Sequence, residues 1–355
     1  MRVFLLSLSM LLLSVLSVTA EEKHQPAEKG ELDLKEFIIG HIVNDYSWHI
    51  LTTSEGKHVS IPLPVILYSE RSGFHVFMSS KFHHGQATYK GFKIAHEGPN
   101  AGRIVEVDKQ GHVYESGLLD LSIKKVVVGL FVTVIVLLIV FLRAAKMAVR
   151  DPKSEPKGIL SFVEPLIVFV KDDIAASAIG EKHTRFLPYL LTIFFFIFFT
   201  NLFGLIPIPP FGANVTGNIS VTAALAFITF VITNVNGNRN YWKHIFNAPG
   251  VPWWIKIPVP LMPIIELIGV FTKPLILAIR LFANMTAGHI VLLAFISLIF
   301  IFGAIAPAVG LAVSPFSMLF SVFMILLDIL VSFIQAFVFT LLSALYFGMA
   351  VEEHH

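Results

Sequence analysis

The side chains best suited to chemistry lie inside two long apolar segments near the C-terminus, 260–302 and 314–350. An arginine or aspartate at the centre of such a segment costs at least ~2.5 kcal/mol on membrane-insertion scales, and these residues usually mark ion pathways. Because the chain has no cysteine, thiolate metal sites, disulfides and cysteine nucleophiles are excluded. We therefore expect ion transfer carried by oxygen and nitrogen groups. The candidates are Glu266, Lys273, Arg280, Asn284, His289, Asp328 and Gln335.

The candidates in the first segment fall on two faces of a helix. At about 100° per residue, Lys273 and Arg280 are seven residues apart and share a face, and Asn284 lies one turn beyond Arg280. His289 follows Arg280 by nine residues and therefore points to the opposite side. One helix thus presents two different polar surfaces.

The second segment carries a polar stripe. Ser314, Ser321, Asp328 and Gln335 recur every seven residues on an otherwise apolar helix. For the serines, hydrogen bonding between helices explains the pattern equally well. For Arg280 and Asp328, a purely structural ion pair is the weaker explanation because burying both charges is costly.

The composition indicates a membrane protein. Of the 355 residues, 55% are hydrophobic and 14% are charged, whereas soluble domains carry about 25% charged residues. The mean hydropathy is +0.76. Such a chain cannot cover itself with a water-facing surface. The formal net charge of +2 argues against nucleic acid as a partner.

The N-terminus has the features of a secretory signal peptide over residues 1–20. Arg2 precedes an apolar run shorter than the roughly 20 residues that a spanning helix needs, and small residues lead to Ala20. The abrupt change to Glu21 favours cleavage near Ala20, and the alternative is an uncleaved anchor. Either arrangement delivers residues 21–120 to the far side of the membrane.

Residues 21–120 are predicted to form a small extracytoplasmic domain that contains strands. Three segments between Gly and Pro breaks are typical of short strands: 59–61, 74–78 and 103–107. The region holds nine of the fourteen histidines, but they lack a recognisable ligand spacing. We therefore expect solvated or locally hydrogen-bonded histidines and no metal centre.

Residues 121–355 are predicted to form an all-α polytopic membrane domain with about five crossings. Five cations between Arg143 and Lys157 mark the cytoplasmic side, and residues 158–182 suit an interfacial or cytoplasmic amphipathic helix. The last two segments are longer than the ~30 Å hydrocarbon core, so we expect them to be strongly tilted, broken or re-entrant, with a turn over 303–313. The C-terminus falls on the cytoplasmic side. The crossings are 123–142, 186–208, 219–235, 260–302 and 314–350.

Several motifs in the membrane domain resemble those of one family. Residues 274–289 read PLILAIRLFANMTAGH and resemble the signature of subunit a of rotary F-type ATP synthases. Three further runs match in the family's order, with NLFGLIP at 201–207, NVT at 214–216 and IQAFVF at 334–339. The resemblance covers roughly residues 120–350. It does not extend to the signal peptide or the extracytoplasmic domain.

The resemblance implies an arrangement and a set of partners. In this family, two long tilted helices face a rotating ring of c subunits, and Arg280 matches the arginine that faces the ring carboxylates. Asn284 and Gln335 match polar positions beside it, and Glu266 matches an acidic position. The implied setting is a bacterial inner membrane, with b-type peripheral stalk subunits and the rest of the ATP synthase as partners. The subunit would be non-catalytic and without a cofactor, because ATP chemistry belongs to other subunits.

The family mechanism uses two offset half-channels. A proton enters from outside, neutralises a ring carboxylate, travels with the ring and leaves when that carboxylate meets Arg280, which cannot relay a proton itself. His289 and Asp328 match positions that hold a histidine or an acid in relatives, so they form a complementary pair. We assign proton uptake to this pair, with Glu266 and Gln335 as neighbours.

Two other functions fit parts of the pattern. A stand-alone ion-coupled secondary transporter would also place charges in broken spans, but it would be expected to show repeated halves, and none is visible. A membrane hydrolase is less consistent with the sequence, which has neither a His-Glu-x-x-His pattern nor a Gly-x-Ser-x-Gly elbow.

Overall fold

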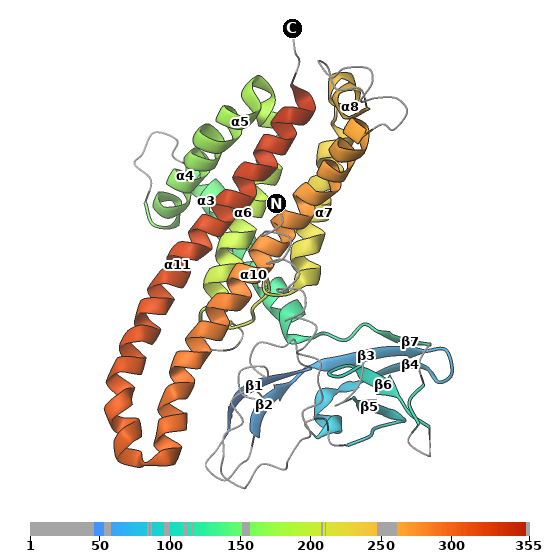
Figure 1. Ribbon diagram of the computed structural model, residues 1–355, viewed down its shortest axis with the longest axis vertical. Coiled ribbons are helices and arrows are strands. Elements are labelled where there is room, and N and C mark those ends of the chain that lie inside the picture. The colour runs from blue at the N-terminus through green and yellow to red at the C-terminus, as the bar shows by residue number, and fades with distance from the viewer. Residues whose placement is uncertain are drawn as a thin grey trace, which may run out of the picture.

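The structure is a computed structural model in which a small β domain precedes a group of long helices (Figure 1). The predicted signal peptide, 1–20, lies outside the described residues. The β domain lies at the end of the helices where α10 (Leu261–Ile305) turns into α11 (Pro307–Val351), and the C-terminus lies at the other end. The described residues are 46–52, 58–83, 85, 87–95, 100–108, 112–114, 117–150, 157–206, 209, 211–246 and 261–352.

The β domain consists of three small antiparallel sheets, with strand orders β1-β2, β4-β3-β7 and β5-β6. The strands predicted at 59–61, 74–78 and 103–107 are confirmed as β2, β4 and β6. A short 3-10 helix, Ser79–Phe82, follows β4. The strands are β1 (Ser47–Thr52), β2 (His58–Pro62), β3 (Pro64–Ser69), β4 (Gly73–Met78), β5 (Phe92–Ile94), β6 (Ile104–Glu106) and β7 (Leu118–Asp120).

The core of the β domain lies between the three-stranded sheet and the β5-β6 pair. Val65 and Leu67 alternate along β3 and are fully buried, as expected for one face of a strand with period two. They pack with Phe82, Phe92 and Ile104. One face of the β4-β3-β7 sheet therefore covers this core.

The membrane domain is helical throughout its described elements. Four helical segments are long and apolar enough to cross a membrane, and a fifth candidate arises if α7 and α8, bent by 104°, count as one span. This agrees with the prediction of about five crossings. The helices are α3 (Lys125–Arg150), α4 (Ile159–Val168), the π-helical η3 (Phe169–Ala176), α5 (Ser177–Ile179), the 3-10 helix η4 (Gly180–Lys182), α6 (His183–Gly204), α7 (Ile219–Val235), α8 (Arg239–Phe246), α10 and α11.

The two last helices are unbroken and longer than predicted. Each contains 45 residues, or about 67 Å of helix at 1.5 Å per residue. The expected turn over 303–313 is wrong, because α10 continues to Ile305 and α11 starts at Pro307. Proline fits the first turn of a helix, where its missing N–H is no loss. Gly310 lets the two helices meet at once, since a Cβ added there would lie 2.6 Å from Cα of Gly303.

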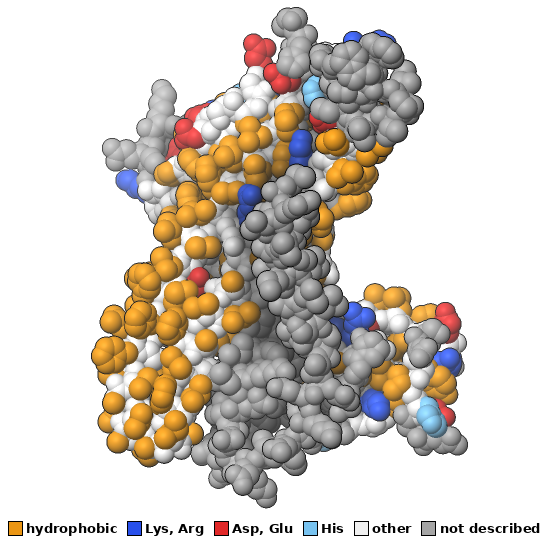
Figure 2. Space-filling model, viewed as in Figure 1, with side chains coloured by type: hydrophobic (Ala, Val, Ile, Leu, Met, Phe, Trp, Pro, Cys, Tyr) orange, Lys and Arg blue, Asp and Glu red, His pale blue; other side chains and the backbone are white. Residues whose placement is uncertain are grey.

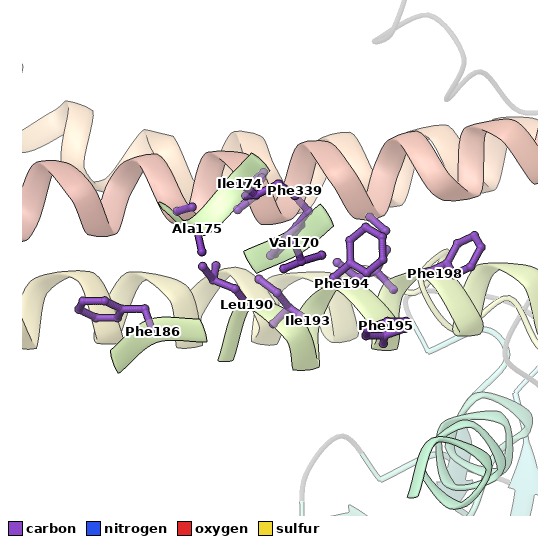
Figure 3. Packing of buried hydrophobic residues seen from close by; sticks show 14 of the residues in the cluster. Val170, Ile174, Ala175, Phe186, Leu190, Ile193, Phe194, Phe195, Phe198 and Phe339 are labelled. Carbon is purple, nitrogen blue, oxygen red and sulfur yellow. The ribbon is translucent and has the colours of Figure 1, made fainter. Parts of the chain in front are cut away.

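The segment predicted as an amphipathic helix at 158–182 packs on the membrane domain. Its inward side chains, such as Val170 and Ile174, are fully buried in a cluster with residues of α6 and α11, while Lys171 is exposed. Figure 3 shows side chains of this cluster between the helices, including Phe194 and Phe339. Gly180, with φ +73°, ends this helical segment before α6 begins. Whether the segment lies at the membrane interface stays a prediction.

Gly348 is the closest approach of α11 to α5, and we expect Gly348→Ala to destabilise the protein. An added Cβ would overlap the carbonyl oxygen of Ala178, a backbone atom that no rotamer change can move. Overpacking of this kind costs about 1–3 kcal/mol, more than the gain in helix propensity of at most about 1 kcal/mol. The thermal unfolding midpoint in detergent should therefore fall.

Gly269→Ala is the matched control, because nothing lies within 4 Å of a Cβ added to this helical glycine. The control should be neutral or stabilising by up to about 1 kcal/mol. Equal midpoints for the two variants would show that α5 does not pack on α11 as described.

The β domain is joined to the helices by a compact junction. Trp48 of β1 is buried against Val126 of α3 and against Ala213 and Val215 of the segment between α6 and α7. At the start of α3, Asp120 forms an ion pair of 3.2 Å with Lys124 and accepts a hydrogen bond of 2.5 Å from the hydroxyl of Tyr46. Burial opposes the charge of Asp120, but hydrogen bonds from Ser122 and Tyr46 and the charge of Lys124 outweigh burial and lower its pKa.

Candidate functional site

Arg280 lies on an exposed face of α10. Ile276, Ala283, Asn284 and Ala287 are exposed at helical spacing on either side of it, which matches the face expected for Arg280 and Asn284. Within the described part of the chain, Arg280 forms no ion pair. Arg280 therefore places a guanidinium on an apolar surface where no carboxylate of the described residues pairs with it.

His289 lies on the other side of α10, as its spacing predicts. The imidazole of His289 packs against α6 at Gly204, where an added Cβ would lie in ordinary van der Waals contact, 3.5 Å from Nε2. This Nε2 atom is buried and has no hydrogen-bond partner in the structure. A buried polar atom without a partner costs about 1–3 kcal/mol, which favours a water molecule or a mobile proton at this place.

Asp328 is buried between α11 and α10. A Cβ added to Gly288 would lie only 2.6 Å from its Oδ1, and its Oδ2 has no hydrogen-bond partner among the described groups. Asp328 therefore contacts α10 at the residue that precedes His289. The expected complementary pair is adjacent in space but is not joined, because the described side chains include no ion pair between Asp328 and His289.

The polar stripe on α11 is confirmed as a buried feature over most of its length. Ser321, Asp328 and Gln335 are each less than 9% exposed, and Ser332 beside them is fully buried. Gln335 therefore lies on the same line as Asp328. It does not share the exposed surface of Arg280.

Glu266 is far from this group, and the expectation that it neighbours the uptake pair is wrong. It precedes His289 by 23 residues on one continuous helix, a separation of about 34 Å. Glu266 instead lines a cavity of about 450 Å³ at the C-terminal end of the molecule. The polar and charged residues that line it are Asn240, Tyr241, Lys243, His244, Glu266, Lys273 and Glu352.

This cavity continues toward Arg280. A smaller space shares Tyr241 and Lys273 with it and reaches Pro274 and Tyr346. Nζ of Lys273 lies 5.7 Å from the ring centroid of Tyr346. Along α10, the polar lining therefore comes within two helical turns of Arg280 on its N-terminal side, whereas His289 lies on its C-terminal side.

Comparisons with known proteins identify the family of the chain. Residues 127–348 match the family model described as ATP synthase A chain. The chain belongs to the ATP synthase A chain family. It is 44% identical over 246 residues to ATP synthase subunit a of Chlorobium phaeobacteroides, covering 67% of this chain and 68% of the relative. Subunit a of Chloroherpeton thalassium is 42% identical over 248 residues, with 68% and 70% covered.

The N-terminal part of this ATP synthase A chain member matches separately. Residues 37–124 match a family model described as a domain of unknown function, and the two matched regions do not overlap. The β domain is therefore an addition to the ATP synthase A chain region. It ends where α3 begins, at Lys125.

Three polar residues of the ATP synthase A chain region were not singled out from the sequence. Asn201 of α6, Asn214 before α7 and Thr286 of α10 each have a buried polar atom without a partner in the described structure. Asn201 accepts a hydrogen bond of 2.5 Å from Thr216. Asn201 and Asn214 belong to the runs NLFGLIP and NVT, so these motifs contained the signal, and the fold places Asn201 next to Thr216 of the second run.

Proposed function

We propose that this chain is the proton-translocating stator subunit of a rotary ATP synthase, which loads and unloads ring carboxylates through two half-channels. Arg280 is the release trigger and the seal between them. The observation that carries this proposal is the exposed guanidinium of Arg280, which pairs with no carboxylate among the described residues and lies between two separate polar regions. A polar region on each side of one fixed cation is what two offset half-channels require.

The physical reason for two half-channels is the use of the membrane potential. A proton that crosses the full potential gains about 2.3 kcal/mol per 100 mV, and one continuous channel would dissipate this energy. Arg280 is always protonated and cannot pass a proton on. Its fixed charge favours the ionised form of a ring carboxylate beside it, so the carboxylate releases its proton into the exit path.

The uptake path would begin at the β-domain end of the helices. Asn214 and Asn201 lead toward Gly204, against which His289 packs, and Asp328 follows at Gly288, the residue before His289 on α10. Because no ion pair joins His289 and Asp328 among the described side chains, ordered water would carry the proton between them. Thr286, whose buried hydroxyl has no hydrogen-bond partner among the described residues, extends this polar set.

The exit path would be the cavity at the other end of the helices. Glu266, Lys273 and His244 line it, and it extends toward the Arg280 face. Glu266 therefore acts in proton release and not in uptake, in contrast to the expectation from the sequence.

The partners and the orientation belong to the same proposal. The exposed face of α10 around Arg280 contacts a ring of c subunits, and both long helices are strongly tilted against it. The b-type peripheral stalk subunits hold the chain in place. The chain is a multi-pass membrane protein, and we propose the bacterial inner membrane, with residues 21–120 in the periplasm and the C-terminus in the cytoplasm.

The decisive experiment is ATP-driven proton pumping in vesicles that contain the purified complex. We expect the chain to co-purify with a ring of small apolar subunits and the vesicles to acidify when ATP is added. A chain that runs alone in detergent and supports ion-coupled solute uptake would be a secondary transporter.

The orientation is tested with two engineered thiols in a chain that has no native cysteine. Ser80→Cys, on an exposed residue of the β domain, should react with an impermeant thiol reagent in intact spheroplasts. Ser154→Cys, in the cation-rich segment outside the described residues, should react only after permeabilisation. The reverse labelling pattern would invert the orientation.

A further inference from the structure

The β domain has an apolar face that no described residue covers. On β4, Phe74, Val76 and Met78 are exposed while the residues between them turn inward. Tyr68 of β3 and Leu119 of β7 continue this surface across the sheet, since Tyr68 pairs with both Phe74 and Leu119. These five side chains are between 42% and 65% exposed. We call this surface, together with Leu121, the outer face of the sheet.

Two apolar faces on one antiparallel sheet are unusual for a domain in water. Such a sheet normally packs one face on the core and presents polar residues on the other. Here the inner face, with Val65 and Leu67, already covers the core of the β domain. The outer face therefore faces an apolar environment outside the described β domain.

The three-stranded sheet lies on the side of the β domain that is close to the helices. β3, β4 and β7 lie on the side of the β domain nearest to the helices, with β5 and β6 beyond them (Figure 1). In the same view these strands run across the long direction of the helices. Figure 2 shows hydrophobic side chains on the side of the β domain that is turned toward the helices.

The outer face is continuous with a helix surface that requires lipid. β7 ends at Asp120, Leu121 is 56% exposed, and α3 begins at Lys125. α3 is a candidate span whose Phe131 and Ile135 are exposed. A few residues therefore separate the outer face from side chains in the hydrocarbon region. The Trp48 cluster and the Asp120–Lys124 ion pair restrain this junction.

We propose that the outer face lies on the bilayer, in the headgroup region of the leaflet on the β-domain side. The β domain is then an interfacial module that holds the outer end of α3 and the segment between α6 and α7 at a fixed depth. Apolar faces of interfacial elements insert about 5–10 Å into the headgroup boundary. Phe74 and Tyr68 suit this depth because aromatic rings concentrate at membrane interfaces. The inference does not depend on the proton path or on which compartment holds the β domain.

The test uses the full chain in vesicles of phosphatidylcholine and phosphatidylglycerol that carry a spin label near the headgroup. An environment-sensitive fluorophore is attached to the cysteine of Val76→Cys or of Leu119→Cys. These positions lie on the two edge strands of the sheet, β4 and β7. Thr88→Cys is the matched control. Thr88 is exposed, and it directly precedes Tyr89, which pairs with Phe92 of β5. All three positions are on the surface, and equal elution profiles and protease resistance verify that each variant is folded.

The expected result is quenching by the spin-labelled lipid at positions 76 and 119 that is at least about threefold stronger than at position 88, as for side chains in the headgroup boundary. Iodide in the buffer should quench in the reverse order. Equal lipid quenching at all three positions would place the outer face in water and overturn the proposal. Protection from both quenchers at 76 and 119 would also overturn it, because protein would then cover the face, either residues 1–45 or a second copy of the chain.

Discussion

Arg280→Ala is expected to abolish ATP-driven proton pumping and ATP synthesis, with a loss of about 100-fold or more, equal to at least ~2.7 kcal/mol. Without the fixed cation, a ring carboxylate that arrives at this point keeps its proton. Arg280→Lys should restore little, since an ammonium lacks the planar guanidinium head and can lose its proton when it is desolvated. Folding should survive, because Arg280 is exposed and forms no ion pair with described residues.

Lys273→Ala is the matched control for Arg280→Ala. Lys273 is an exposed cation on the same helix face, seven residues earlier. If any cation on this face served as the release trigger, both alanine variants would fail equally, whereas we expect Lys273→Ala, which removes one lining side chain of the exit cavity, to lower the pumping rate without abolishing it. Co-purification of the ring is measured for every variant. Normal pumping by an assembled Arg280→Ala complex would rule out the mechanism.

Asp328→Leu is expected to slow proton uptake by about tenfold or more, or ~1.4 kcal/mol in activation free energy. Leucine has a similar size but cannot bind water or a proton, so it interrupts the polar set between His289 and the ring. The uptake rate of Asp328→Asn should fall between those of the unchanged protein and Asp328→Leu, because the amide keeps hydrogen bonds but loses the charge. Proton release through the Glu266 cavity should change less, since this cavity lies at the other end of α10.

Ser321→Ala is the control for Asp328→Leu. It removes a buried polar group from the same stripe two turns away, where we expect a smaller effect. The measurement is the rate of passive proton uptake into vesicles under an imposed potential, at several pH values. If Asp328→Leu and Ser321→Ala were equally active in assembled complexes, the uptake path would not pass Asp328.

The helix spacing in the sequence was sufficient to predict which residues share a face. Arg280 and Asn284 share the exposed face of α10, His289 points away from it, and Asp328 and Gln335 lie on one buried line. These relations follow from the fixed rotation per residue within one helix. The strands β2, β4 and β6 were likewise predictable, because alternation and flanking turn residues are local signals.

Relations between helices could not be predicted in this way. The sequence led us to group Glu266 with His289 and Asp328, yet a single unbroken helix separates Glu266 from them. The sequence predicts a turn that contains the glycines 303 and 310, whereas their close contact lets α10 and α11 turn almost at once. In the sequence, a glycine that permits close packing of two helices looks the same as a glycine that ends a helix. The position of the neighbouring backbone determines which of the two roles the glycine has.

Composition and helical period are properties of the chain alone, so they were enough to predict a multi-pass membrane protein with a polar set in its last two helices. The fold was needed to show that His289 packs on Gly204 of α6, that Asp328 packs on Gly288, and that Glu266 lines a separate cavity. The physical reason is that contacts between helices depend on the close approach of backbones far apart in the chain. That approach is set by the whole packing and not by any local pattern.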